Sequence, residues 1–202
     1  MNVNTSLAAV ATMDASPQAL RAYRAQEKLL NGEDVLVRAV RPDDKQALQD
    51  GLHRLSTESV YYRFFRTKQN LTDEELAYFT EIDFARHVGL LAVVREGDAD
   101  IPVGVGRYMV YQTEPVRAAE IAFAVIDVYQ GLGIATLLLK HLTRIARGAD
   151  ISEFHANVLA GNLKMMDVFS HFGLPMISTR SGNVLKIRLL LSDDSIEPPR
   201  QA

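Results

Sequence analysis

The sequence YQGLGIAT, residues 129–136, joins an apolar strand-like run to an apolar helix-like run. Its two glycines, Gly131 and Gly133, stand one residue apart at the junction. A strand-to-helix turn of this kind leaves backbone N–H groups unpaired at the first turn of the helix, where the helix dipole also favours an anion. Glycine at both positions would let a phosphate approach those amides closely. The turn alone fits either a phosphate site or an ordinary helix start, because short glycine patterns are common.

Two familiar phosphate-binding motifs do not match this turn. A P-loop has Lys followed by Ser or Thr after its second glycine, whereas Ile134 and Ala135 follow Gly133. A dinucleotide fingerprint has a third small residue where this chain has Thr136, and it lies in a parallel βαβ unit. The strands before the turn are expected to form hairpins instead.

The composition is that of one globular domain. The chain has 202 residues, of which 48% are hydrophobic and 23% charged. A formal net charge of −3 argues against a protein that grips nucleic acid through a broad basic face. The absence of cysteine excludes disulfides and thiolate chemistry. No basic, signal-like N-terminus and no apolar run of about 20 residues is present, so we expect a cytoplasmic protein without a membrane partner.

Outward from the glycine turn, the hydrophobic pattern predicts a mixed α/β domain with a central, mostly antiparallel sheet of about seven strands and flanking helices. We expect a flexible arm and a helix at 17–30 within residues 1–33, one domain at 34–191, and a disordered tail at 192–202. Thr72 and Glu75 have capping-box spacing. The predicted strands are 34–40, 87–96, 101–111, 118–126, 151–159, 176–180 and 184–191, and the predicted helices of the domain are 43–55, 56–65, 73–82, 135–146 and 163–172.

The pattern Gln130-x-x-Gly133-x-Ala135 after an apolar strand resembles the cofactor-binding turn of the GNAT superfamily of acyl-CoA-dependent N-acyltransferases. Asn162 followed by LKMMDVFSHFG resembles the later GNAT segment beside the pantetheine arm. The upstream segments VLVRAVRPDD, LSTESVYYRFF, LTDEELAYFTEID and AEIAFAV are similar to the catalytic domain of Pat-type bacterial protein lysine acetyltransferases. The resemblance covers about residues 34–191 and implies a GNAT fold with acetyl-CoA as co-substrate.

The resemblance also implies a set of cofactor-binding residues. Backbone amides of the turn are expected to hold the pyrophosphate, with the Thr136 hydroxyl as a further donor. Val125 and Asp127 are expected to offer backbone groups to the pantetheine arm, with side chains that can vary. Phe169 stands where many GNAT enzymes have a Tyr that acts as general acid, so we expect it to pack beside the cofactor, and the acid stays unassigned. The full set is Val125, Asp127, Gln130, Gly131, Leu132, Gly133, Ile134, Ala135, Thr136, Asn162 and Phe169.

Acetyl transfer to an amine needs a base, because a free lysine is neutral in roughly one molecule in 2,500 at pH 7. The alternation in AEIAFAV places Glu120 on one face with Ala122 and Ala124, where it is the one ionisable group. The resemblance assigns the general base to Glu120, acting through a water. The alternative is a solvated carboxylate at the end of a half-buried strand.

The expected function is therefore transfer of an acetyl or short acyl group to lysine side chains of proteins. The alternatives are a GNAT enzyme for a small amine, such as a polyamine, amino acid or aminoglycoside, and a non-catalytic acyl-CoA sensor. The helix at 17–30 is expected to cover the acceptor cleft or to mediate a homodimer, and any regulation would come from a separate partner.

Other candidate residues are weaker. The cluster YYRFF at 61–65 is the best candidate to shape the acceptor cleft, although an amphipathic helix with Tyr61, Phe64 and Phe65 in the core and Arg63 in solvent accounts for most of it. Glu81 and Asp83 rank low as a lysine-attracting pair. The histidines have no metal-ligand spacing, so we propose no metal site.

Overall fold

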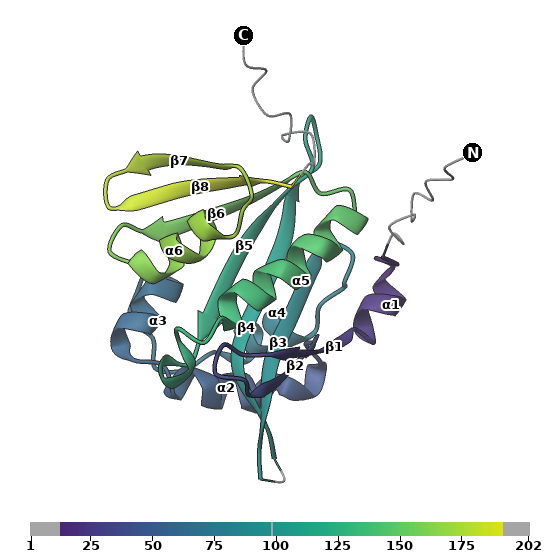
Figure 1. Cartoon of the computed structure of the whole chain (residues 1–202), viewed down its shortest axis with the longest axis vertical. Coiled ribbons are helices and arrows are strands. Elements are labelled where there is room, and N and C mark those ends of the chain that lie inside the picture. The colour runs from purple at the N-terminus through teal and green to yellow at the C-terminus, as the bar shows by residue number, and fades with distance from the viewer. Residues whose placement is uncertain (1–12, 98, 192–202) are drawn as a thin grey trace, which may run out of the picture.

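The computed structural model describes residues 13–97 and 99–191. This part of the chain forms an eight-stranded sheet in the order β1-β2-β3-β4-β5-β6-β8-β7 (Figure 1). Neighbouring strands are antiparallel except β5 and β6, which are parallel. The strands are β1 (Arg24–Lys28), β2 (Asp34–Ala39), β3 (His87–Glu96), β4 (Ala99–Gln112), β5 (Ala118–Val125), β6 (Glu153–Leu159), β7 (Met176–Ser181) and β8 (Val184–Leu190). The predicted mixed, mostly antiparallel α/β domain is confirmed, with one strand more than expected.

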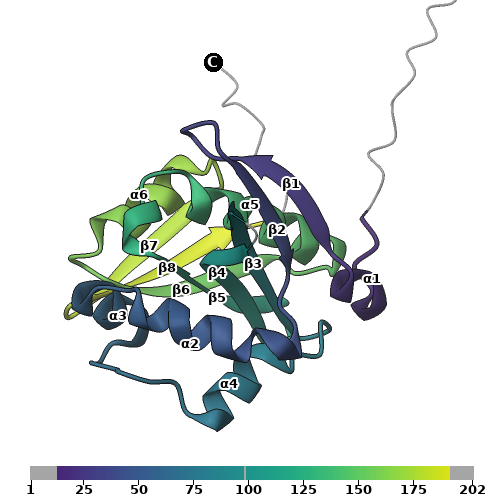
Figure 2. The same ribbon diagram turned by 90° about the horizontal axis from the view of Figure 1, so that it is seen from below.

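Helices cover both faces of the sheet (Figure 2). On one face lie α2 (Lys45–His53), α3 (Thr57–Phe64) and α4 (Asp73–Thr80), which a short 3-10 turn, η1 (Pro42–Asp44), precedes. On the other lie α5 (Ile134–Gly148) and α6 (Leu163–His171). No helix within the described ranges is long and apolar enough to cross a membrane.

The long helix α5 packs directly on β4. A Cβ added to Gly104 would lie 2.6 Å from Ile134 Cγ2, and one added to Gly106 would lie 3.1 Å from Leu142 Cδ1, so a larger residue at either position would crowd α5. The side of α5 that faces the sheet is fully buried and consists of Leu138, Leu139, Leu142, Ile145 and Ala146. The helical spacing predicts this stripe.

The capping box that precedes α4 is confirmed. Glu75 N donates to Thr72 Oγ1 at 3.2 Å, and Thr72 N donates to Glu75 Oε2 at 2.9 Å. Each side chain thereby satisfies an amide that has no partner inside the helix.

The prediction of a helix over 17–30 is wrong after its first turn. The helix α1 spans only Pro17–Arg21, with Ser16 Oγ accepting from Ala19 N at 3.3 Å. β1 follows and pairs with β2, from Arg24 opposite Arg38 to Lys28 opposite Asp34. Most of the expected arm, residues 1–12, and the expected tail, residues 192–202, lie outside the described residues.

The residues Asn31-Gly32, predicted to end a helix, instead turn the β1–β2 hairpin. Gly32 has φ +86°, and Leu29 N donates to Glu33 O at 2.9 Å across the turn. Leu20 and Leu29 are both buried in the core. The segment from α1 to β2 is therefore part of the domain.

Candidate active site

The parallel strands β5 and β6 separate soon after they meet. They pair only from Ala118 opposite Glu153 to Glu120 opposite His155, although β5 continues to Val125 and β6 to Leu159. Beyond Glu120 an open cavity of about 1330 Å³ lies between β5, β6, α3 and α6. The divergence therefore creates a cleft in the middle of an otherwise continuous sheet.

The cavity brings together nearly all of the predicted site residues. Leu132 is the exception, because it is partly buried against the core and its carbonyl accepts from Leu30 N at 3.1 Å. The predicted residues that line the cavity are Glu120, Val125, Asp127, Gln130, Gly131, Gly133, Ile134, Ala135, Thr136, Asn162 and Phe169.

Glu120 lies where β5 and β6 separate. The residues on either side of it, Ala119 and Ile121, are buried against the α5 face, while Glu120 is exposed toward the cavity. The alternation along β5 that the sequence predicts is therefore present. The position of the carboxylate at the cavity wall is compatible with proton transfer, and its role as base stays a prediction.

The glycine turn offers a row of free amides. Gly131 has φ +79° and Gly133 has φ +88°, which residues with a side chain rarely adopt. Within the described ranges the amides of residues 131–136 donate no hydrogen bond to the protein, and Leu137 N is the first to do so, to Gly133 O at 2.9 Å. A Cβ at Gly131 would meet no atom within 4 Å. Donors and space together fit a phosphate group.

The amide of Gln130 does not belong to this row, although the sequence analysis includes it. Gln130 N donates to Asp127 O at 3.2 Å, inside the 3-10 turn η2 (Asp127–Tyr129). The side chain of Gln130 is also engaged, because its Nε2 donates to Ser59 Oγ and to Val125 O, each at 3.1 Å. Gln130 therefore fixes the turn to β5 and α3.

The Asp127 side chain, expected to vary with little effect, accepts three hydrogen bonds in the fold. Its carboxylate accepts from Ser56 N at 2.8 Å, Ser56 Oγ at 2.7 Å and Ser59 Oγ at 2.9 Å. Burial alone would raise the pKa of Asp127, but the Ser56 hydroxyl and amide and the Ser59 hydroxyl bring that pKa below its usual value. Asp127 thus holds the N-terminus of α3 against the end of β5.

Lys164 is a further residue of the site, which no motif in the sequence predicts. It is exposed on the first turn of α6, lines the cavity, and its Nζ donates to Gln130 Oε1 at 2.8 Å. A cation therefore lies beside the row of amides and adds positive charge near the proposed phosphate. Its only signal in the sequence is its position two residues after Asn162.

Asn162 and Phe169 fix α6. Asn162 Oδ1 accepts from Met165 N at 3.2 Å and so caps the helix. Phe169 is fully buried, with its ring centroid 6.2 Å from that of Phe123. A packing role for Phe169 beside the cavity agrees with this position.

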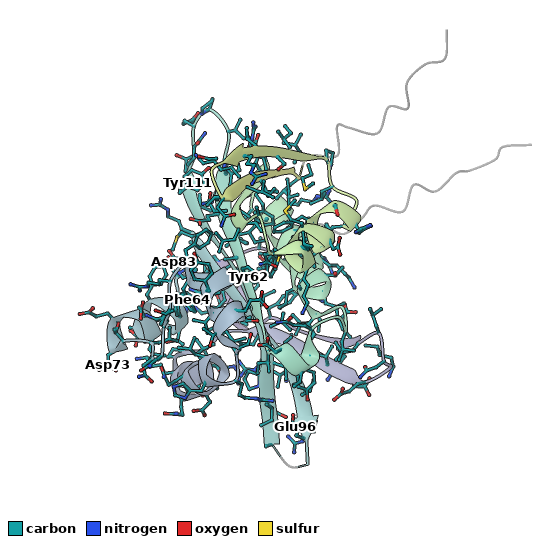
Figure 3. The ribbon with its side chains drawn as sticks, turned by 90° about the vertical axis from the view of Figure 1, so that its left-hand side faces the viewer. Tyr62, Phe64, Asp73, Asp83, Glu96 and Tyr111 are labelled. Carbon is teal, nitrogen blue, oxygen red and sulfur yellow. The ribbon has the colours of Figure 1, made fainter. Side chains whose placement is uncertain are left out.

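The aromatic cluster at 61–65 lies on the opposite wall. Tyr62 and Phe64, labelled in Figure 3, line the cavity from α3 together with Arg63 and Phe65. The core interpretation is wrong for Tyr61 and Phe65, which are 44% and 40% exposed, and Arg63 is partly buried instead of solvated. Tyr62 Oη donates to Gly161 O at 3.1 Å and so links α3 to the loop before α6.

The acidic residues after α4 are occupied by the fold. Glu81 forms an ion pair with Lys45. Asp83 Oδ1 accepts from the amides of Ala85 and Arg86 at 2.9 Å and of His87 at 2.8 Å. Both carboxylates therefore already have partners within the fold.

The histidines in strands have protein partners. The pKa of His87 is lowered to about 4, mainly by burial. The charge of Arg107 also lowers this pKa, and its effect is larger than the opposite effect of Asp83. His155 contacts the Tyr111 hydroxyl, and its Nε2 lies 2.7 Å from Glu153 Oε2. No group of three or more His, Asp or Glu side chains in the described ranges is arranged to hold a metal ion.

The chain is similar to known acetyltransferases both in sequence and in structure. Residues 52–174 match the model of the acetyltransferase (GNAT) family. The chain is 29% identical to the acetyltransferase PA5475 of Pseudomonas aeruginosa over 73% of this chain and 78% of that protein. It is 30% identical to the acetyltransferase Pat of Mycolicibacterium smegmatis over 76% of this chain, but it spans only 45% of that protein. The crystal structure of the GNAT domain of S. lividans PAT superposes with a TM-score of 0.75 at 33% identity, over 83% of this chain and 96% of that domain.

Proposed function

The chain belongs to the acetyltransferase (GNAT) family, and from that membership we propose that it transfers an acetyl group from acetyl-CoA to the ε-amine of lysines in proteins, in a bacterial cytoplasm. Acetyl-CoA-dependent acetyl transfer is the activity of the family. The protein-lysine acceptor is our inference, supported by the similarity to the Pat proteins.

The observation that carries the proposal is the arrangement of one cavity. The free amides of residues 131–136 lie at one wall and Glu120 lies where β5 and β6 separate. The amide row, with Lys164 beside it, suits the pyrophosphate of the co-substrate. The edge of β5 from Ile121 to Ala124, which no longer pairs with β6, suits the amide-bearing pantetheine arm, much as an added strand would pair. The Val125 carbonyl at its end already accepts from Gln130 Nε2.

The residues of this chain then have distinct tasks. Acetyl-CoA supplies the acetyl group as a thioester. Glu120, through a water, accepts the proton that the lysine ammonium must lose, because only the neutral nitrogen can attack. The C–N bond forms as the C–S bond breaks, the attacking nitrogen releases its second proton to water, and coenzyme A departs as a thiolate. Tyr62, Arg63, Phe64 and Phe65 line the wall against which the acceptor would lie.

The experiment that tests this function is a comparison of acceptors. The purified protein is incubated with labelled acetyl-CoA and either a bacterial lysate or a panel of polyamines, amino acids and aminoglycosides. We expect acetyl-lysine on lysate proteins by mass spectrometry, and at least about a hundredfold slower labelling with Glu120→Gln. Turnover of small amines alone would instead assign a small-amine acetyltransferase. Tight acetyl-CoA binding without transfer to any amine would assign a sensor.

A further inference from the structure

Two arginines lie side by side under α4, on the face of the sheet that carries Glu120. Arg107 of β4 is only 7% exposed. Its guanidinium carbon lies 3.8 Å from the centroid of the Phe79 ring, and its Nη1 lies 3.5 Å from His87 Nε2. Arg63 of α3 is partly buried, and its guanidinium carbon lies 5.1 Å from the centroid of the Phe64 ring. Each arginine therefore rests on an aromatic ring.

Neither guanidinium has an anionic partner. Among residues 13–97 and 99–191, no carboxylate oxygen lies within 4 Å of either group, and Arg63 donates no hydrogen bond. Burial first, and then the charge of Arg63, lower the pKa of Arg107 to about 9. Burial also lowers the pKa of Arg63, which the more distant Glu120 partly opposes. Unpaired buried charge is costly, so an anion bound here would relieve an existing strain on the fold.

The two arginines border a second, smaller cavity. It has a volume of about 70 Å³ between α2, α4 and the sheet, and both arginines line it among mostly apolar residues. A water occupies about 30 Å³, so the space is sufficient for a carboxylate group. The smaller cavity and the one at Glu120 share the residues Leu55, Arg63, Phe64 and Ala124. Arg63 thus stands at the boundary between the acceptor cleft and the smaller cavity.

We propose that Arg63 and Arg107 form a carboxylate-binding subsite, so that the favoured acceptor amine carries a carboxylate within reach of the two guanidiniums. Guanidinium groups bind carboxylates through paired, charge-assisted hydrogen bonds. The carboxylate comes either from an acidic side chain beside the modified lysine or from a free amino acid. The proposal rests on the acetyltransferase function above, which it refines by naming the acceptor class.

The test compares acceptors that differ only in the carboxylate. Lysine peptides with Glu on either side of the lysine are compared with the same peptides carrying Gln, and free lysine is compared with lysinamide. A charged hydrogen bond corresponds to about a tenfold to hundredfold effect, so we expect kcat/KM to favour the carboxylate form by that factor. A preference seen with the peptides shows that the carboxylate comes from an acidic side chain beside the modified lysine. A preference seen only with free lysine shows that it comes from a free amino acid.

Variants assign the preference to the subsite. Arg63→Gln and Arg107→Gln should each bring the ratio of kcat/KM between carboxylate and amide acceptors close to one. Arg24→Gln, an exposed arginine of β1 outside both cavities, should leave the ratio unchanged. If the buried Arg107→Gln variant does not fold, the Arg63→Gln variant still tests the proposal, because Arg63 is only partly buried.

A binding measurement separates this proposal from the function on which it rests. Glutarate is titrated calorimetrically into the wild-type protein and the Arg63→Gln variant, with no acceptor or acetyl-CoA present. Binding that the variant loses supports the subsite even if no amine is acetylated. Equal kcat/KM for carboxylate and amide acceptors in the wild type, or a preference that both arginine variants retain, would overturn the proposal.

Discussion

Glycine at position 131 serves both the backbone and the cavity. Its φ of +79° strains any larger residue, yet a Cβ there would meet no protein atom within 4 Å. We expect Gly131→Ala to lower the free energy of unfolding by about 1 kcal/mol, because of the left-handed backbone. We also expect acetyl-CoA affinity to fall at least tenfold, because the methyl group would hold the phosphate away from the amides.

Gly32→Ala is the matched control for that change. Gly32 has φ +86°, its Cβ would also meet nothing within 4 Å, and it does not line the cavity. It should lose similar stability in a denaturant titration and keep the affinity measured by calorimetry. If Gly131→Ala binds acetyl-CoA as the wild type does, the turn is only a helix start.

A second prediction at this scale concerns Glu120. Replacing it by Gln removes the proton acceptor but keeps the size of the side chain, so kcat should fall by about a hundredfold or more. The dissociation constant of acetyl-CoA should not change, because the carboxylate is not part of the amide row. A normal rate with an unchanged pH profile would remove Glu120 from the mechanism.

The sequence predicts the place of a residue well where that place depends only on its neighbours along the chain. The face of Glu120 follows from alternation within one strand, and the free amides follow from the start of one helix. The roles of Asp127 and Arg107 do not follow from such patterns. Asp127 bonds to Ser56, which is 71 positions away, and Arg107 meets His87 across 20 positions. Contacts between residues so far apart in the sequence depend on how the elements pack, and spacing along the chain does not reveal this packing.

Among the elements, β1 shows why a helix is predicted where a strand forms. Its sequence RAQEK consists of good helix formers. As an edge strand it has no fully buried position, so the alternation that identifies a strand is weak. Pairing with β2 overrides helix propensity, and Asn31-Gly32, a common hairpin turn, is the signal that identifies it.

The pairing of β1 with β2 predicts the effect of deleting residues 1–32. The deletion removes Leu20 and Leu29 from the core, and burial of each side chain contributes about 1.5–3 kcal/mol. It also removes the backbone bonds that cover the edge of β2. We expect a fall in Tm of more than 10 °C or insoluble protein. If the segment instead only covered the acceptor cleft and inhibited the enzyme, its deletion would raise turnover.

Deletion of residues 1–12 is the control, since none of these contacts involves them. It should retain the Tm of the full chain in a calorimetric scan. A 1–32 deletion that is equally stable and more active would restore the idea of an inhibitory segment.

The connection between η2 and α3 gives a further prediction. Asp127→Ala removes the acceptor of three hydrogen bonds, and we expect a loss of about 1–2 kcal/mol together with a higher KM for the acceptor, because α3 forms one wall of the cleft. The lowered pKa of Asp127 determines how its contribution to stability changes with pH. The stabilisation is present above the unfolded value of about 3.9 and is lost as the pH falls through the folded pKa.

Asp34→Ala serves as the comparison for Asp127→Ala in urea titrations. Asp34 pairs with Lys28 on the surface, where both side chains are mostly exposed, so its removal should cost less than 1 kcal/mol. Equal effects of the two variants, with no change in acceptor KM, would show that Asp127 does not hold α3.

For the molecule as a whole, the sequence predicts the order of elements because most strand pairs are neighbours along the chain. The hairpins β3–β4 and β7–β8 follow from alternation on either side of a turn. The pairing of β5 with β6 is different, since α5 lies between them and nothing in either strand shows that they separate after Glu120. The cleft at this divergence is a property of the assembled sheet, so the sequence predicts the residues of the site but not its shape.

The buried His87 should dominate the acid sensitivity of the folded protein. Its ring is 4% exposed, lies beside Arg107 and the Tyr78 ring, and has a pKa lowered to about 4, mainly by burial. In the unfolded chain the value is about 6.5. Between these values the unfolded state binds the proton more readily, so stability is constant above pH 6.5 and falls as the pH drops toward 4, by up to about 3 kcal/mol.

His87→Gln removes this titration and keeps a polar side chain next to Arg107. Its free energy of unfolding should therefore fall less between pH 6.5 and 4.5 in urea titrations than that of the wild type, while the buried His141, whose pKa burial also lowers, titrates in both proteins. His53→Gln, at an exposed histidine of α2, should follow the wild type. The carboxylates with lowered pKa, such as Asp83 and Glu153, begin to lose their contribution at about pH 5, and they do so alike in all three proteins. A wild-type curve that is flat down to pH 4.5, or a His87→Gln curve that falls as steeply, would show that burial of this imidazole does not set the acid limit of the fold.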